Sequence, residues 1–252
     1  MKALVTVGDG TFRLQDVAVP TPGVDEVLVK VIAVAQNPTD WKTLLLHTQP
    51  GNILGCDFAG IIVHIGAEVP PGIGPNGAYA EYVKADAALV IALPDDMTFE
   101  NAAQLGVASL TVCQCLYQCF RLPTPLQPAS EPEDILIWSG TSATGQYAVQ
   151  FAKLAGLRVI STSSPKNTGF VKSLGADEVF DYADSKTPKR VSVATGGSLK
   201  YAVDCISEGM TPNQVSMSLG KDGGTIATLL PYESRRKGVK TVFILAYSAL
   251  GG

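Results

Sequence analysis

The chain has 252 residues, of which 46% are hydrophobic and 17% charged, and a formal net charge of -4. This composition suits a globular protein long enough for two modest domains. Apart from a local basic patch at Arg235, Arg236 and Lys237, no dense Lys or Arg block occurs, which argues against nucleic acid and anionic membranes as partners. The N-terminus lacks the apolar run of a secretory signal, and no apolar stretch is long enough to cross a bilayer, so we expect a cytoplasmic location.

The cysteines are few and include no C-x-x-C pair. There are five of them, Cys56, Cys113, Cys115, Cys119 and Cys205. An odd number without close pairing favours a reducing compartment over a disulfide framework.

The first half of the chain has the pattern of short strands. Runs of β-branched residues such as "EVLVKVIAVAQNP" and "GIIVHIG" are bounded by Gly and Pro, which predicts an all-β segment. A helix is predicted over residues 100–120, and the four prolines of residues 121–134 predict a linker after it. We therefore expect one domain over residues 1–122 and a second over residues 123–252.

The second half alternates between apolar runs and stretches of helical period. This alternation predicts βαβ units on a parallel sheet. The apolar runs lie at residues 134–138, 157–162, 178–181, 199–206 and 225–230.

A small-residue turn follows the first of these predicted strands. The pattern G-x-S-x-x-G is formed by Gly140, Ser142 and Gly145, and a helix is predicted from Gln146 to Ala155. The N–H groups that begin such a helix, and the positive end of its dipole, can bind a pyrophosphate that small residues allow to approach. The middle position of a dinucleotide fingerprint is usually Gly, so an ordinary strand-to-helix turn is the alternative.

The end of the second predicted strand indicates which dinucleotide binds. An NAD-binding fold places Asp or Glu about 20 residues past the glycines, whereas an NADP-binding fold needs polar and cationic groups for the 2′-phosphate. Here the residues are Ser163, Ser164, Lys166 and Asn167. With no carboxylate to repel a phosphate, and Lys166 to attract it, NADP(H) is the predicted cofactor; the alternative for Lys166 is a solvated loop lysine.

Several motifs together carry a resemblance to a known family. They are "NPTDWK" (37–42), "LGCDFAGIIVHIG" (54–66), "NGAYAEYV" (76–83), "AAQLGVASLTV" (102–112), the glycine turn with its helix, and "SLGADEVFDY" (173–182). In this order they resemble the medium-chain dehydrogenase/reductase superfamily. The turn "SGTSATG", the stretch "TSSPKN" and the Pro-rich segment are similar, within it, to fungal trans-acting enoyl reductases that serve polyketide synthases.

The resemblance implies an α/β fold with an incomplete GroES-like β-barrel domain before a Rossmann doubly wound parallel sheet. It also implies which residues bind the cofactor and the substrate. For NADP(H) these are Thr39, Asp40, Trp41, Lys42, Thr141, Ser142, Ala143, Thr144, Gly145, Ser164, Pro165, Lys166, Asn167, Tyr182, Leu229 and Leu230. For the acyl substrate they are Val112, Cys113, Gln114, Cys115, Leu116, Tyr117, Gln118, Cys119, Leu245, Ala246, Tyr247, Ser248 and Ala249. No catalytic acid or base stands out.

Many members of the superfamily hold zinc, which needs Cys or His at several positions. Where those relatives carry Gly-His-Glu, this chain has Gly55, Cys56 and Asp57, and its only histidines are His47 and His64. Three cysteines on the predicted helix 100–120 are more typical of core packing than of a metal cluster. We therefore expect a zinc-free reductase that adds hydride to an activated C=C.

Two other patterns fit less well. Tyr182 and Lys186 have the Y-x-x-x-K spacing of short-chain dehydrogenases, but they lie too close behind the glycine turn, and by resemblance Tyr182 contacts the adenosine end of NADP. Ser163 and Lys166 form S-x-x-K, but Pro165 would break the helix that a serine hydrolase uses to align them.

The predicted function is a trans-acting enoyl reductase that transfers hydride from NADPH to the C=C of an unsaturated polyketide thioester. A partner polyketide synthase, or a hybrid with a nonribosomal peptide synthetase, would carry the thioester; whether the reductase is a monomer or a dimer stays open. A stand-alone NADPH quinone or enone reductase remains an alternative. The resemblance also implies a longer segment between residues 70 and 76 and a return segment after residue 252 in relatives, so a noncatalytic NADP-binding scaffold is a second alternative.

Overall fold

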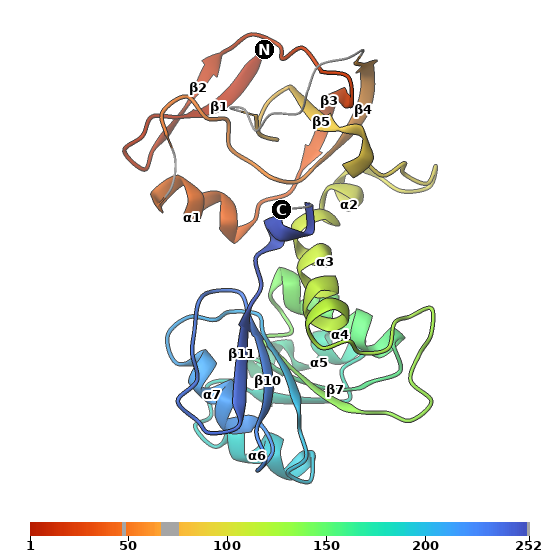
Figure 1. Ribbon diagram of the computed structural model, residues 1–252, viewed down its shortest axis with the longest axis vertical. Coiled ribbons are helices and arrows are strands. Elements are labelled where there is room, and N and C mark those ends of the chain that lie inside the picture. The colour runs from red at the N-terminus through yellow and green to blue at the C-terminus, as the bar shows by residue number, and fades with distance from the viewer. Residues whose placement is uncertain (47–48, 67–75, 251–252) are drawn as a thin grey trace. The chain divides into compact units, whose positions relative to one another are not determined.

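A computed structural model describes residues 1–46, 49–66 and 76–250, with side chains through Ser248. The chain forms two compact units, Met1–Val107 and Ala108–Gly252 (Figure 1).

The first unit is built mainly of antiparallel strands. β1 (Lys2–Thr6) and β2 (Phe12–Asp16) form a hairpin. β3 (Glu26–Val34) is the central strand of a sheet with the order β4-β3-β5, in which β4 is Phe58–Ile65 and β5 is Tyr82–Asp86. Short strands are thus confirmed for both runs on which the prediction rested.

This unit also contains a helix that the all-β prediction missed, and the beginning of the predicted helix 100–120. α1 (Pro38–Leu46) has Pro in its first turn, where the missing N–H costs nothing, and Asp40 near the positive end of its dipole. α2 (Phe99–Ala103) starts at Thr98, whose side chain accepts the N–H of Asn101 as an N-cap.

β4 presents apolar side chains to solvent. Ile61, Ile62, Val63 and Ile65 are between 48% and 71% exposed. Within the described ranges, β4 pairs with β3 alone. The segment in which we expect a shortened barrel falls on residues 67–75, outside the described residues.

The second unit holds a parallel sheet of six strands in the order β11-β10-β9-β6-β7-β8. The strands are β6 (Asp134–Trp138), β7 (Arg158–Ser163), β8 (Glu178–Asp181), β9 (Tyr201–Asp204), β10 (Gly224–Thr228) and β11 (Val239–Phe243). The helices are α4 (Ala143–Leu154), α5 (Thr168–Ser173), α6 (Thr187–Ala194) and α7 (Thr211–Ser218). The order of the strands reverses between β6 and β9, the switch point at which doubly wound folds bind nucleotides.

Both faces of this sheet are buried, as its continuous apolar runs predict. Ile135 and Ile137 of β6 belong to one apolar cluster, and Leu136 and Trp138 belong to another. Because successive side chains of a strand point to opposite faces, the two clusters are the cores on the two sides of the sheet. The five predicted parallel strands are confirmed, with ends that differ by a few residues.

The predicted helix 100–120 is broken into pieces. α2 ends near Gln104, α3 spans Gly106–Cys113, and a π-helix spans Gln114–Cys119. The units divide between Val107 and Ala108, rather than at 122/123, because Val112, Cys115 and Leu116 pack into the core of the second unit. The Pro-rich segment is not a linker either, since Leu122 joins that core and the Ala129 N–H donates to the Ala155 carbonyl.

Candidate functional site

The glycine turn leads into α4 earlier than the sequence indicated. α4 begins at Ala143, not at Gln146, because Ser142 acts as its N-cap and accepts the Gly145 N–H at 3.0 Å. The Gln146 N–H is already bonded to the Ser142 carbonyl. The first N–H groups of a helix have no partner within it, so those of Ala143 and Thr144 are the donors available to a phosphate.

The two glycines of the turn allow close packing. A Cβ on Gly145 would lie 2.0 Å from the Ser139 carbonyl oxygen, and one on Gly140 would lie 2.4 Å from the Ser161 hydroxyl and 2.7 Å from Val171. The turn is tied to β7 by a bond of 2.8 Å from the Ser139 N–H to the Thr162 hydroxyl. Helix and strand can therefore approach only because these positions lack a side chain.

The residues predicted for the 2′-phosphate lie at the end of β7. Ser164 to Asn167 turn away from Ser163, the last residue of the strand, in a single 3₁₀ turn. Lys166 is exposed and pairs with no acid in the described part of the chain. The Tyr182 N–H donates to the Ser163 carbonyl, so Tyr182 flanks the same strand end with its ring 49% exposed.

Leu229 and Leu230 follow β10 and are half-buried. A polar cluster that sequence reasoning missed holds them in place. Asp204, at the end of β9, accepts the Ser207 N–H at 2.9 Å, and the Ser207 hydroxyl accepts the Leu229 N–H at 2.8 Å. The sequence did contain a signal for this cluster: Asp204 ends an apolar run, and Ser207 follows it three residues later.

Asp204 is fully buried, and burial raises its pKa above the ordinary value of 3.8, although its hydrogen bonds from Ser207, Ile206 and Thr211 oppose this shift. A group whose pKa is higher when folded binds more protons in the folded state, so its contribution to stability is lost as pH rises through that pKa. The free energy of unfolding that Asp204 contributes therefore decreases as pH rises, beginning above about pH 4.

We expect Asp204→Asn to remove this dependence. The free energy of unfolding of the variant, relative to wild type, should increase as pH rises above about 4. Urea titrations followed by the fluorescence of Trp138, which lies opposite Asp204 in the sheet register, measure it. Asp222→Asn, at an exposed aspartate of the same unit, is the control; a pH-independent difference for Asp204→Asn would contradict the assignment.

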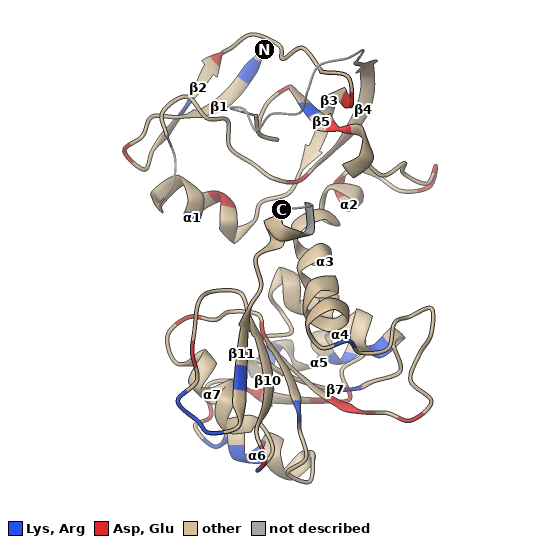
Figure 2. Cartoon of the chain, in the orientation of Figure 1, with Lys and Arg blue, Asp and Glu red and all other residues tan. Residues whose placement is uncertain are grey.

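The two segments predicted for the substrate are joined by one side chain. The Gln114 amide donates to the Ser248 hydroxyl at 3.0 Å and to the Leu245 carbonyl at 3.4 Å. The Gln114 Oε1 and the Tyr117 hydroxyl are buried and accept or donate no bond in the described structure. A π-helix often marks a functional position in a helix, and the whole span 106–119 carries no charged residue (Figure 2).

Other predicted substrate residues lie in the core. Val112, Cys115 and Leu116 are 0% exposed, which favours packing over contact with a ligand. Burial raises the pKa of Cys113 and Cys119. The side chain of Ala249 is outside the described residues.

Thr39, Asp40, Trp41 and Lys42 form the first half of α1 in the first unit. Asp40 is buried, whereas Trp41 is 52% exposed, and the Lys42 Nζ lies 5.4 Å from the centre of the Trp41 ring. Asp40 therefore bonds within its own unit, whereas Trp41 is exposed to solvent.

The residues at the zinc position do not suit a metal. The two Asp57 carboxylate oxygens both lie 3.0 Å from the Val107 nitrogen, and one of them also accepts the Asn37 amide at 2.8 Å. Across the described ranges, no three His, Cys, Asp or Glu side chains gather as a metal site would require. His47 lies outside these ranges.

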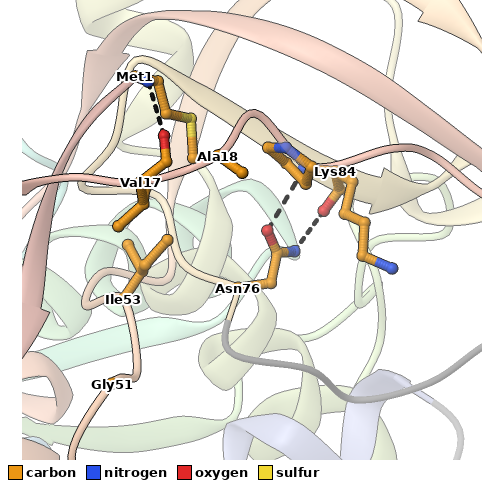
Figure 3. Close-up of a pocket in the computed structure, with 8 residues that line it drawn as sticks. Met1, Val17, Ala18, Gly51, Ile53, Asn76 and Lys84 are labelled. Carbon is orange, nitrogen blue, oxygen red and sulfur yellow. Dashed lines mark hydrogen bonds between the residues drawn. The ribbon is translucent and has the colours of Figure 1, made fainter.

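A cavity of about 260 Å³ lies elsewhere in the first unit (Figure 3). Met1, Val17, Ile53 and Asn76 line it beside Lys84, whose ammonium group is paired with Glu26. It contains none of the predicted site residues and is smaller than most ligand pockets.

Comparisons with known proteins identify the family. The model described as "Alcohol dehydrogenase GroES-like domain" matches residues 23–72, and "Zinc-binding dehydrogenase" matches residues 143–233. A trans-enoyl reductase of Alternaria alternata is 39% identical over 99% of this chain and 78% of its own. The chain belongs to the trans-enoyl reductase family.

A second trans-enoyl reductase, from Cochliobolus carbonum, is 35% identical over 99% of this chain and 90% of its own. Among solved structures, a mycobacterial protein complexed with NADPH is 25% identical with a TM-score of 0.83, covering 98% of this chain and 82% of that one. A quinone oxidoreductase of Pseudomonas syringae is 26% identical, with the same TM-score and coverage.

These findings confirm the predicted fold class, a GroES-like domain followed by a Rossmann sheet, and the predicted membership of this chain in the medium-chain superfamily. None of the helices in the described ranges combines the length and hydropathy that a membrane crossing requires.

Proposed function

We propose that this protein is a trans-acting enoyl reductase that reduces the C=C of an α,β-unsaturated thioester with NADPH. The thioester would be carried by a separate polyketide synthase, or by its hybrid with a nonribosomal peptide synthetase. The observation that carries the proposal is the 39% identity to a named trans-enoyl reductase across nearly the whole chain.

The second unit supports the cofactor part of the proposal. The N–H groups of Ala143 and Thr144 begin a helix of 12 residues at the switch point of the sheet, where a diphosphate would meet positive dipole and unpaired donors. At the end of the next strand, Lys166 pairs with no acid among the described residues, and its charge would be available to a 2′-phosphate. Leu229 and Leu230, held by Ser207, would pack against the cofactor.

The chemistry needs few protein groups. When bound, NADPH would supply the hydride that the β-carbon of the thioester accepts and would become NADP⁺, and the α-carbon would take a proton, so that the C=C would become a C–C single bond. The chain must hold the acyl group beside the cofactor, exclude water and donate a hydrogen bond where negative charge develops on the thioester oxygen. In the proposed acyl site, the Tyr117 hydroxyl is buried and bonds to no group in the described part of the chain, so it could donate that hydrogen bond.

A stand-alone quinone reductase is the second candidate. The 26% identity to the quinone oxidoreductase of Pseudomonas syringae, over 98% of this chain, favours it. Such an enzyme would accept small soluble quinones and need no carrier protein.

Steady-state oxidation of NADPH separates the candidates. We expect turnover with a crotonyl thioester, faster when a carrier protein bears the acyl group than when N-acetylcysteamine does, and little turnover with a quinone. Faster reduction of the quinone would favour the second candidate. NADPH binding with neither activity would indicate the noncatalytic scaffold.

A further inference from the structure

α1 is fastened to the first unit by few apolar contacts. Asp40 and Leu44 are the buried residues of this nine-residue helix, whereas Trp41, Leu45 and Leu46 are 52%, 59% and 69% exposed. A helix this short is marginal by itself, and one buried leucine adds only a small part of the stability it needs. The hydrogen bonds of Asp40 therefore contribute to the attachment.

Tyr79 supplies the side-chain bond to Asp40 from outside the helix. Its hydroxyl lies 2.7 Å from Asp40 Oδ2 and 3.1 Å from the Ala35 carbonyl. One hydroxyl has one proton, so the shorter bond to the carboxylate is favoured because a charged acceptor makes the stronger bond. Burial, with Asp40 as a further cause, raises the pKa of Tyr79, so the hydroxyl keeps its proton.

The position of Tyr79 is itself determined by its surroundings. Its backbone bonds to Leu54 and to Leu4. Its ring lies over Gly55, which has a φ of +96° and where a Cβ would be 2.5 Å from a ring carbon. Gly55 therefore makes room for the ring, and the hydroxyl can reach α1 from a rigid base.

The same polar network extends to the start of α3. Asn37 donates its backbone N–H to Asp40 at 2.7 Å and its side-chain amide to Asp57 at 2.8 Å. Asp57 in turn accepts the N–H of Val107, in the first turn of α3. α1 and the start of α3 are thus joined through buried polar groups within the first unit.

This network is costly for stability. Asp40 is 8% exposed, and its Oδ1 is buried with no partner among the described residues. An unpaired buried acceptor destabilises the folded state, and an apolar pair could hold a helix at lower cost. Such a group calls for an explanation other than stability.

We propose that Tyr79 is a positioning residue, whose hydroxyl fixes Asp40 and so sets the place of α1 with Thr39 and Lys42. The inference rests on the proposed function and on the resemblance, which assigns Thr39 and Lys42 to the binding of NADP(H). In this proposal Tyr79 acts through Asp40 and not through contact with cofactor or substrate.

Tyr79→Phe removes the hydroxyl and keeps the ring over Gly55. Tyr82→Phe is the matched control, because Tyr82 is in the same unit, is half-buried, and its hydroxyl bonds to no described residue. We expect Tyr79→Phe to speed hydrogen exchange of the α1 amides about tenfold and to lower kcat about tenfold. The KM for NADPH and the melting temperature should stay close to those of Tyr82→Phe.

Asp40→Asn removes the charge of the acceptor and should also speed exchange in α1, and Tyr79→Phe should add less to it than it does in wild type, because both changes weaken the same bond. The inference is overturned if exchange in α1 is the same in Tyr79→Phe and Tyr82→Phe, if exchange rises across the whole unit, or if kcat is unchanged in an active enzyme. If wild type binds NADPH but reduces no enoyl thioester, the proposed function fails. Faster exchange confined to α1 would then still support the positioning of the helix by Tyr79.

Discussion

Lys166→Glu should weaken the binding of NADPH about 100-fold and leave the binding of NADH within about threefold of wild type. Lys166 stands at the end of β7 with no acid paired to it in the described structure, so in the proposed site its charge is available to the 2′-phosphate. A hydrogen bond to a charged group is worth about 1.5–3 kcal/mol, and reversing the charge adds repulsion. NADH lacks the 2′-phosphate and loses neither term.

Binding constants from nucleotide fluorescence titrations measure both effects at a single, stated salt concentration, because exposed charges are screened. Lys172→Glu is the control, since Lys172 is also exposed and lies one helix further along the same unit. An equal loss for NADPH and NADH would contradict the assignment of Lys166. If the two lysine changes weakened NADPH binding equally, the effect would come from the net charge of the unit and not from a contact of Lys166.

Gly145→Ala should destabilise the second unit by at least about 3 kcal/mol and abolish NADPH binding. The added methyl group would lie 2.0 Å from the Ser139 carbonyl oxygen, a backbone atom in a turn that is bonded to β7. To make room, α4 would have to move away from the sheet. The N–H groups of Ala143 and Thr144 would move with it.

Gly169→Ala is the matched control, because a Cβ at Gly169 meets nothing within 4 Å and the residue lies in α5. This change should be neutral or stabilise by up to about 1 kcal/mol, since Ala is the better helix former. Urea unfolding followed by Trp138 fluorescence compares the two. Wild-type stability and NADPH affinity in Gly145→Ala would show that the helix does not need its close approach to the turn.

The sequence predicted the second unit well because its signals are local. A continuous apolar run such as 134–138 is typical of a buried strand or helix, and its length and spacing favoured a strand. The glycine turn was equally visible, but the start of α4 was placed too late. Ser142 was assigned to the phosphate as part of the motif, and its capping of Gly145 was overlooked.

Other parts could not be predicted from local patterns. The apolar and cysteine-rich stretch 106–119 has one composition throughout, yet Cys115 is fully buried while Gln114 bonds to Ser248, more than a hundred residues away. The residues assigned to cofactor and substrate remain predictions. The structure places the residues predicted for the phosphates, Ser142–Gly145 and Ser164–Asn167, at the carboxyl ends of the neighbouring strands β6 and β7. It also joins Gln114 to the turn after β11.

The sequence alone determined the order of the two folds, the parallel sheet and the family. These depend on periodicity and on motifs whose residues lie close together in the chain. The tertiary structure decided where the units divide, that Asp204 and Ser207 hold Leu229, and that Asp40, Asp57 and Tyr79 form one buried network. These features depend on hydrogen bonds between residues far apart in the chain. Such bonds form only after folding has removed water from both partners, and no local pattern records them.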